Sequence, residues 1–156
     1  MRWVTHQTMA VMAAFAVQLP AVGIAAAWAG SVAPDAIDQR KAAGALFRQR
    51  KFNQAHRQSS HWFGWWLLPL LASWAGLLGP LPDAALQGFA FGALSHVLLD
   101  MCTTKGVPLL PMAGKRLSLR ICATGSLAEY AILGMGVILF WLALRAGSIS
   151  LDVAIY

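Results

Sequence analysis

Four long apolar stretches, almost free of charged residues, limit what this chain can fold into. They span residues 7–33, 61–78, 84–102 and 127–144. Each of the last three has about the 17–25 residues with which a helix crosses a bilayer core. Of the 156 residues, 58% are hydrophobic and only 12% are charged, a composition that excludes a disordered tail and does not suit an ordinary soluble domain. The sequence therefore predicts an all-α integral membrane helical bundle, built as a single domain over residues 1–156.

The first apolar stretch, Gln7–Ala33, is interrupted in its middle by Pro20. It forms either one kinked span or two short helices, about residues 6–18 and 21–33, that make a hairpin dipping into the bilayer and returning. Hydropathy alone does not decide between them. The N-terminal segment loosely resembles a signal peptide, but we expect it to be retained because the chain stays apolar to its end. The expected architecture is three full spans plus this hairpin or kinked span.

The basic residues predict the orientation of the spans. They cluster before residue 61 and after residue 102, whereas the Gly79–Asp83 turn has none. By the positive-inside rule, both clusters are cytoplasmic and the turn faces the other side. We expect these residues to contact anionic membrane lipids, and the scarcity of aromatic residues among them does not favour nucleic acid. Cys102 and Cys122 flank the second cluster, so we expect reduced, structural thiols there.

The third apolar stretch contains an ionisable pair. His96 and Asp100 are four residues apart, which puts them on one face of a helix. Gly88 and Gly92 continue that face and would permit close approach by a neighbouring helix. Ionisable groups inside an apolar span indicate function by default. The alternative is a neutral hydrogen-bonded pair that holds helices together.

Further histidines and carboxylates are expected at the same cytoplasmic depth. With the pair above, they are Asp35, Asp38, His56, His61, His96, Asp100 and Glu129, joined by His6 if the first stretch is a hairpin. Imidazole and carboxylate donors suit zinc or another divalent metal. The number of donors exceeds what one tetrahedral zinc needs, so the sequence predicts two or three ions. Paired metals of this kind are typical of phosphoester hydrolysis.

The segment DAALQGFAFGALSHVLLDMCTTKGVPLLP resembles the signature of the YdjM-like family of bacterial inner-membrane metal-dependent hydrolases. The matching positions are His6, Pro34-Asp35, His56-Arg57 with His61, Ser95-His96 with Asp100, Gly106–Leu110 and Glu129. Two features depart from the family pattern. The acidic motif Pro-Asp-Ala-Ile-Asp is one residue longer, and Gln58, Ser60 and Trp62 replace the usual Gly, Thr and Ser.

That family is similar in turn to zinc-dependent phospholipase C and to single-strand-specific zinc nucleases. The resemblance therefore implies a phospholipase C-like metal site within a helical membrane bundle. The related soluble enzymes use an N-terminal Trp amine as a ligand, which does not carry over to a chain starting Met1-Arg2-Trp3. The resemblance also favours the hairpin, because His6 would otherwise lie across the membrane from the other ligands.

The resulting hypothesis is a membrane-bound, metal-dependent hydrolase of a lipid or lipid-linked phosphoester, with its site facing the cytoplasm. The expected metal ligands are His6, Asp35, His56, His61, His96 and Asp100. Glu129 and Asp38 are the expected catalytic carboxylates, Glu129 as a further ligand or a base that orients water. Arg57 is expected to bind a substrate phosphate through its planar fork. The alternative is a metal-binding membrane scaffold or regulatory protein without catalysis.

Overall fold

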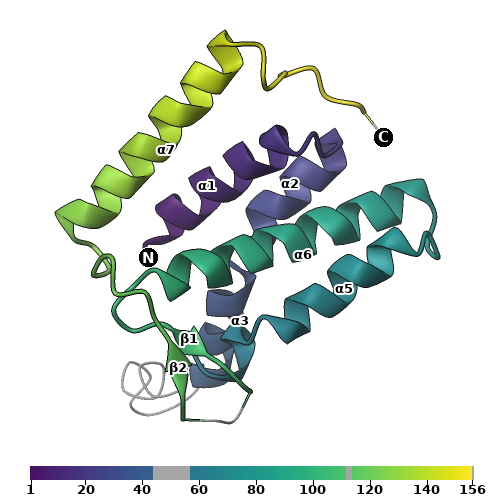
Figure 1. Cartoon of the computed structure of the whole chain (residues 1–156). Helices are drawn as coiled ribbons and strands as arrows, with labels where there is room; N and C mark the ends of the chain where they lie inside the picture. Colours follow the sequence, from purple (N-terminus) through teal and green to yellow (C-terminus); the bar gives the residue numbers. More distant parts are fainter. Residues whose placement is uncertain (44–56, 112–113, 156) are drawn as a thin grey trace.

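The computed structural model describes residues 1–43, 57–111 and 114–155, and these residues are mainly helical (Figure 1). The elements are α1 (Trp3–Ala16), α2 (Ala21–Gly30), α3 (Ala33–Ala42), the short 3-10 helix η1 (Ser59–His61), α5 (Gly64–Trp74), α6 (Pro80–Met101), β1 (Val107–Pro108), β2 (Arg116–Leu117) and α7 (Leu127–Arg145). The two strands pair antiparallel as a small ribbon, with Val107 opposite Leu117. His56, one of the expected metal ligands, lies outside the described residues.

The first apolar stretch forms two helices, α1 and α2, that pack against each other. Gln18 turns the chain with a positive φ of 55°, and Pro20 precedes α2 as its N-cap. Proline lacks the backbone N–H that a continuous helix would need here. The prediction of two helices in place of one kinked helix is therefore confirmed, with bounds of Trp3–Ala16 and Ala21–Gly30. Their insertion into the bilayer stays a prediction.

Helix α6 lies at the centre and packs against α1, α2 and α5 (Figure 1). Its contact with α2 is close because glycines remove the side chains between the two backbones. A Cβ atom on Gly88 would overlap the carbonyl of Gly23, and one on Gly92 would overlap the carbonyl of Ala27. The predicted role of these two glycines is confirmed. This packing brings the end of α2 against the C-terminal half of α6.

The expectation of three full spans is wrong for the stretch 61–78. Among the described helices, only α6 with 22 residues and α7 with 19 are long and apolar enough to cross a membrane. Helix α5 has 11 residues, about 17 Å of length, whereas a bilayer core is about 30 Å thick. Hydropathy overlooked the η1 turn at one end of the stretch and the positive-φ glycines Gly76 and Gly79 at the other.

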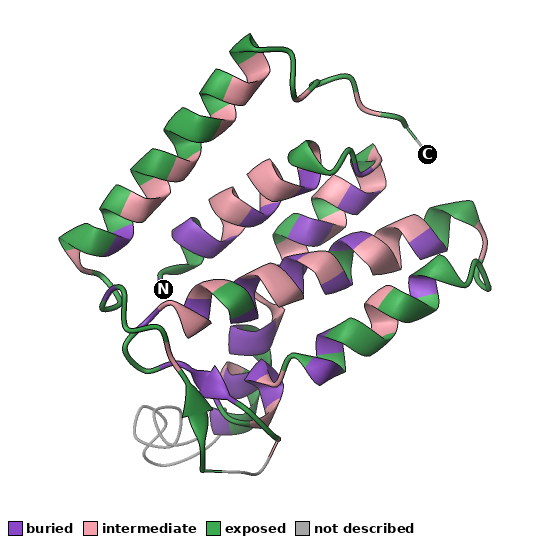
Figure 2. Cartoon of the chain, viewed as in Figure 1, coloured by how far each residue is buried: buried purple, intermediate pink, exposed green. Residues whose placement is uncertain are grey.

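Helix α7 packs against α1 and is exposed along most of its length (Figure 2). Many of its exposed side chains are large and hydrophobic. Glu129 is its one buried residue, while Met135 and Trp141 are more than half exposed. The outer face of α5 is similar, with Trp65 and Leu68 exposed. Exposed apolar surfaces of this extent are typical of contact with a membrane or a partner.

Candidate metal centre

The largest fully buried side chains of the molecule are mostly polar, in contrast to the core of a soluble protein. They include His6, His61, His96, Glu129, Thr5, Thr103, Asp38 and Asp100. They come from α1, α3, η1, α6 and α7, and Thr103 comes from the loop that follows α6. Because a buried polar or charged group is costly unless it is paired, the contacts among these residues determine what the interior can hold.

In His96, on α6, a contact with the end of α2 fixes a proton on Nδ1. Its Nδ1 lies 2.6 Å from the carbonyl oxygen of Ser31, the residue that caps α2. A carbonyl only accepts hydrogen bonds, so Nδ1 must donate and carries the ring proton. In the neutral imidazole, Nε2 therefore presents its lone pair. A hydrogen bond of this kind is the usual way in which a metal-binding histidine is oriented.

His61, in η1, is oriented in the same way by the residue before it. Ser60 Oγ donates to Asp38 Oδ1 at 2.6 Å, because an ionised carboxylate only accepts. With its single proton used, Ser60 Oγ accepts from His61 Nδ1 at 3.0 Å. The lone pair of His61 therefore also lies on Nε2. Asp38 additionally lies 3.4 Å from His61 Nδ1 and accepts from the backbone N–H of Arg57.

The two Nε2 atoms face each other at 3.2 Å, with carboxylate oxygens on two sides. Asp35 Oδ1 lies 3.3 Å from His61 Nε2 and 3.6 Å from His96 Nε2. Asp100 Oδ2 lies 3.5 Å from each of the two nitrogens. Four donors around a tetrahedral zinc, with arms of about 2.0–2.1 Å, are about 3.3–3.4 Å apart. The three separations among Asp35, His61 and His96 are close to this value, and these residues form one group of possible metal donors. Asp100 Oδ2 lies on the other side of the two nitrogens.

Asp35 and Asp100 are held by contacts outside this donor set. Asp35 Oδ2 accepts a hydrogen bond from the indole N–H of Trp3 at 2.9 Å. The guanidinium of Arg57 forks onto Asp100, with Nη2 2.7 Å from Oδ1 and Nε 2.7 Å from Oδ2. Its Nη1 donates to Thr103 Oγ1. Arg57 is 2% exposed and has a positive φ of 60°, a conformation uncommon for a non-glycine residue.

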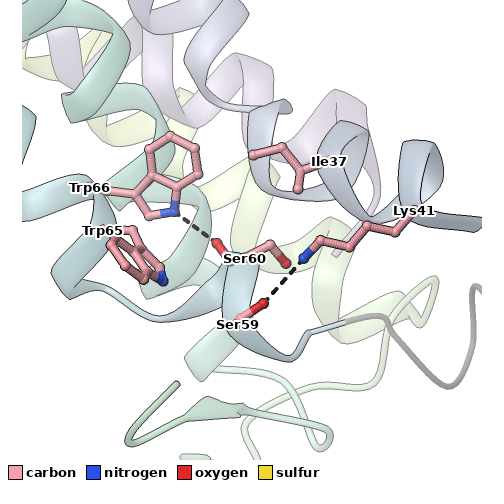
Figure 3. A pocket seen from close by; sticks show the side chains of 6 residues that line it. All are labelled: Ile37, Lys41, Ser59, Ser60, Trp65 and Trp66. Carbon is pink, nitrogen blue, oxygen red and sulfur yellow. Dashed lines mark hydrogen bonds between the residues drawn. The ribbon is translucent and has the colours of Figure 1, made fainter. Parts of the chain in front are cut away.

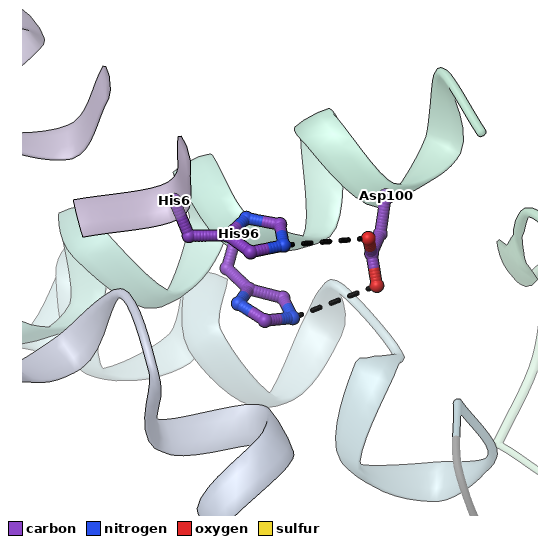
Figure 4. Close-up of side chains that lie close together, drawn as sticks. All are labelled: His6, His96 and Asp100. Atoms are coloured by element: carbon purple, nitrogen blue, oxygen red, sulfur yellow. Dashed lines mark ion pairs between the residues drawn. The ribbon is translucent and has the colours of Figure 1, made fainter. Parts of the chain in front are cut away.

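A second group of possible metal donors shares His96 with the first and consists of His6, His96 and Asp100 (Figure 4). The rings of His6 and His96 stack with their centroids 3.7 Å apart. His6 Nε2 lies 3.4 Å from Asp100 Oδ1. The same oxygen accepts from Arg57 and lies 2.5 Å from the Met1 nitrogen.

The structure brings most of the predicted ligands together. His6, Asp35, His61, His96 and Asp100 all belong to the two donor groups or contact them directly. Asp38 lies behind His61, where it orients the ring, and Arg57 is buried against Asp100; the proposed catalytic and phosphate-binding roles of these two residues stay predictions. The sequence reasoning missed the supporting contacts from Trp3, Ser31, Ser60 and Thr103, because neither spacing nor hydropathy marks a hydrogen-bonding partner.

Glu129 makes its contacts elsewhere, between the N-terminal ends of α1 and α7. Oε1 accepts from the backbone N–H of Arg2 at 2.6 Å and from Thr5 Oγ1 at 2.8 Å. Oε2 accepts from the N–H of Gly125 at 2.6 Å. Glu129 belongs to neither donor group. In this arrangement its carboxylate joins α7 to the start of α1.

We expect Glu129→Gln to weaken the attachment of α7 while leaving the metal content unchanged. The substitution removes the charge from three hydrogen bonds, each worth about 1.5–3 kcal/mol when a charged group is involved. Thermal unfolding in detergent should therefore show a clearly lower midpoint, and elemental analysis should show the wild-type metal content. A lost metal ion with an unchanged midpoint would instead identify Glu129 as a ligand.

The two cysteines do not add donors to either group. Both are free thiols, as the sequence predicted. Burial, followed by the negative charge of Asp100, raises the pKa of Cys102. Burial, followed by the charge of Glu129, raises the pKa of Cys122. Both thiols are therefore protonated at neutral pH, whereas a metal ligand must be a thiolate.

Comparison with known proteins supports the family resemblance over the length of the chain. A family model described as YdjM inner membrane protein matches residues 1–155. No curated protein and no solved structure matches the chain. The distant similarity to phospholipase C and to zinc nucleases stays a prediction.

Proposed function

Because this chain belongs to the YdjM inner membrane protein family, we propose that it is a multi-pass, metal-dependent hydrolase of phosphoesters whose site faces the cytoplasm. The observation that carries the proposal is the buried donor set of His61, His96, Asp35 and Asp100. Imidazole and carboxylate groups are the donors that zinc prefers. With both rings in the neutral tautomer that has its proton on Nδ1, the two Nε2 lone pairs would face each other at 3.2 Å, an arrangement that a bound cation would stabilise.

We propose one ion at this donor set, in place of the two or three that the number of candidate ligands predicted. The second group would use Asp100 Oδ1, which already accepts from the cationic guanidinium of Arg57 at 2.7 Å. A second divalent cation there would be repelled by Arg57 at short range. Oδ2 of the same carboxylate lies 2.7 Å from Arg57 Nε and 3.5 Å from each of the two Nε2 atoms. Because Arg57 already offsets the charge of Asp100, the cluster favours one divalent ion over two.

The residues of the chain divide the work around this ion. His61, His96, Asp35 and Asp100 would bind it, and a divalent metal there would supply Lewis-acid activation of water and of a phosphoester oxygen. Asp38 and Ser60 keep the proton of His61 on Nδ1. The donors are between 0% and 6% exposed, so the surrounding helices restrict bulk water and strengthen each electrostatic contact.

The orientation follows from which end of α6 holds the site. His96 and Asp100 lie near its C-terminal end, and the basic residues Lys105, Lys115, Arg116 and Arg120 follow within twenty residues. The other end of α6 begins at Pro80, after a turn without Lys or Arg. By the positive-inside rule, this distribution of basic residues supports a position of the donors at the cytoplasmic surface. A phosphoester carried by a lipid or a lipid-linked molecule would reach the site from there.

The test uses a charged, membrane-impermeant substrate on vesicles of both orientations. Inverted inner-membrane vesicles containing the protein should hydrolyse bis-p-nitrophenyl phosphate or p-nitrophenyl phosphate, and right-side-out vesicles should not. Vesicles containing the His96→Asn variant provide the background rate. Treatment with a chelator should abolish the difference, and added zinc should restore it.

Two results would contradict the proposal. Hydrolysis only by right-side-out vesicles would reverse the orientation. Purified protein could instead hold a stoichiometric metal ion but hydrolyse neither the phosphodiester, nor the phosphomonoester, nor phospholipids. That result would favour the metal-binding scaffold.

A further inference from the structure

A cavity of about 410 Å³ lies between α3, η1 and α5, next to the donor set (Figure 3). Its lining residues are Ile37, Lys41, Ser59, Ser60, Trp65 and Trp66. This volume is within the usual range of about 300–1,000 Å³ for small-molecule sites. The sequence did not predict any of these six residues to belong to a site.

The lining has a cationic, hydroxylated side and an apolar side. On the first side, Lys41 Nζ lies 3.1 Å from Ser59 Oγ, and its side chain is 45% exposed. An ammonium group has three donors, so this contact and the 3.7 Å approach to Asp38 leave one N–H for a bound anion. On the other side stand the rings of Trp65 and Trp66, as Figure 3 shows.

The apolar side of the cavity continues onto the exposed apolar face of α5. Trp66 is 8% exposed and is fixed by a hydrogen bond from its indole N–H to the Ser60 carbonyl at 2.9 Å. Trp65 is 53% exposed, and Leu68, three residues further on, is 60% exposed. Residues three apart share a helix face. An apolar chain lying on Trp65 can therefore extend over Leu68 into the surrounding lipid.

The cavity adjoins the donor set through a single residue. Ser60 lines it, and its hydroxyl group contacts both Asp38 and His61. The contact with His61 is at Nδ1, whereas Nε2 of the same ring faces the other donors. A phosphate group held by Lys41 and Ser59 would therefore lie on the Nδ1 side of His61, with the imidazole ring between it and the donor atoms.

We propose that this cavity binds a phosphate monoester or diester that carries an apolar chain, with the phosphate on Lys41 and Ser59 and the chain against Trp65 and Trp66. The inference rests on the proposed function, because it assigns that site an amphiphilic substrate. The cationic side complements the phosphate, and the exposed tryptophan and α5 surface suit an acyl chain. Inorganic phosphate shares the first contact but not the second.

The test measures binding without turnover. The probe is lysophosphatidic acid with a brominated acyl chain, which quenches tryptophan fluorescence on contact. It is added to the full-length protein in mixed micelles with a chelator present. We expect Lys41→Gln to weaken binding about tenfold, since one charge-assisted hydrogen bond is lost. Lys41→Arg should retain most of the affinity, and Trp65→Ala should lose both affinity and quenching. Lys105→Gln, which removes a charge remote from the cavity lining, should bind as the wild type does.

Three results would overturn the proposal. Equal binding of the probe by Lys41→Gln and by the wild type would show that Lys41 does not bind the phosphate. An equal loss in Lys105→Gln would show that only general surface charge is measured. If inorganic phosphate displaced the probe as strongly as unbrominated lysophosphatidic acid does, the acyl chain would not contribute to binding.

Metal content, measured separately on the same preparations, distinguishes this inference from the proposed function. Protein that holds stoichiometric metal but shows no Lys41-dependent probe binding contradicts the cavity assignment alone. Protein that binds the probe through Lys41 but never takes up metal contradicts the proposed function alone.

Discussion

Replacing His96 by asparagine is expected to leave the purified protein without its metal ion. His96 supplies one of four converging donors, and its Nε2 lies within 3.2–3.6 Å of the donor atoms of the other three. Asparagine is too short to place a donor at that point. We expect the affinity for zinc to fall by more than the roughly 10–100-fold that is typical when only a supporting residue is removed. Elemental analysis and titration with a zinc-binding dye would measure the loss.

Two further variants make this result specific. Asp38→Asn alters a supporting carboxylate, which contacts Ser60, His61 and the backbone N–H of Arg57, and removes none of the four donors. We therefore expect an intermediate loss, about 10–100-fold. Asp83→Asn removes a buried carboxylate from the opposite end of α6, where Asp83 Oδ2 accepts from the Leu78 N–H, and it should keep the wild-type affinity. If all three variants retained metal equally, the donor set would not be the metal site. If all three lost metal together, the loss would reflect unfolding.

The sequence predicted helix positions well where polarity alone defines them. The expected stretches 84–102 and 127–144 correspond to α6 at Pro80–Met101 and α7 at Leu127–Arg145. Both are bounded by turn residues or polar residues that hydropathy detects. Hydropathy failed at α5, because the uncharged stretch 61–78 begins within the turn that carries His61. The local geometry of a site is not visible in an average over eighteen residues.

The candidate site was predictable to the extent that depth and helical spacing specify it. The i,i+4 spacing of His96 and Asp100 does place both side chains on one face, and both are buried. Glu129 lies at a similar depth by sequence, but its side chain is held by Arg2, Thr5 and Gly125. Depth therefore identifies candidates, whereas the tertiary contacts determine which of them point inward.

Arg57 shows the same limitation for a basic residue. From the sequence, Arg57 is either one more cytoplasmic charge or a contact for a substrate phosphate. Both interpretations predict a side chain that is accessible to solvent or substrate. In the structure it is 2% exposed and forks onto Asp100. Its position beside His56 in the family motif distinguishes it from Arg48 and Arg50, but its pairing with a carboxylate 43 residues away is not visible in the sequence.

Arg57→Gln is expected to destabilise the metal-free protein strongly and the zinc-bound protein much less. Breaking a buried ion pair by removing one partner costs about 3–5 kcal/mol, because the other charge is left uncompensated. Here that charge is Asp100, which is 1% exposed. Zinc bound beside Asp100 Oδ2 would replace the missing positive charge. Unfolding by sodium dodecyl sulphate in mixed micelles, with zinc or with a chelator, measures the two free energies of unfolding.

The difference between the two conditions is the informative quantity, because it separates a structural arginine from one coupled to the metal site. A ligand present at 100 times its dissociation constant stabilises a folded protein by about 2.7 kcal/mol. On adding zinc, the free energy of unfolding of Arg57→Gln should rise by more than that of the wild type. In the variant the ion also compensates the negative charge of Asp100, which has lost its arginine. Arg145→Gln is the matched control: Arg145 is exposed at the end of α7 and stacks on Trp141, so its loss should cost at most about 1 kcal/mol in both conditions. Equal destabilisation of Arg57→Gln with and without zinc would mean that the ion does not bind beside Asp100, and the donor set would then have to exclude that carboxylate.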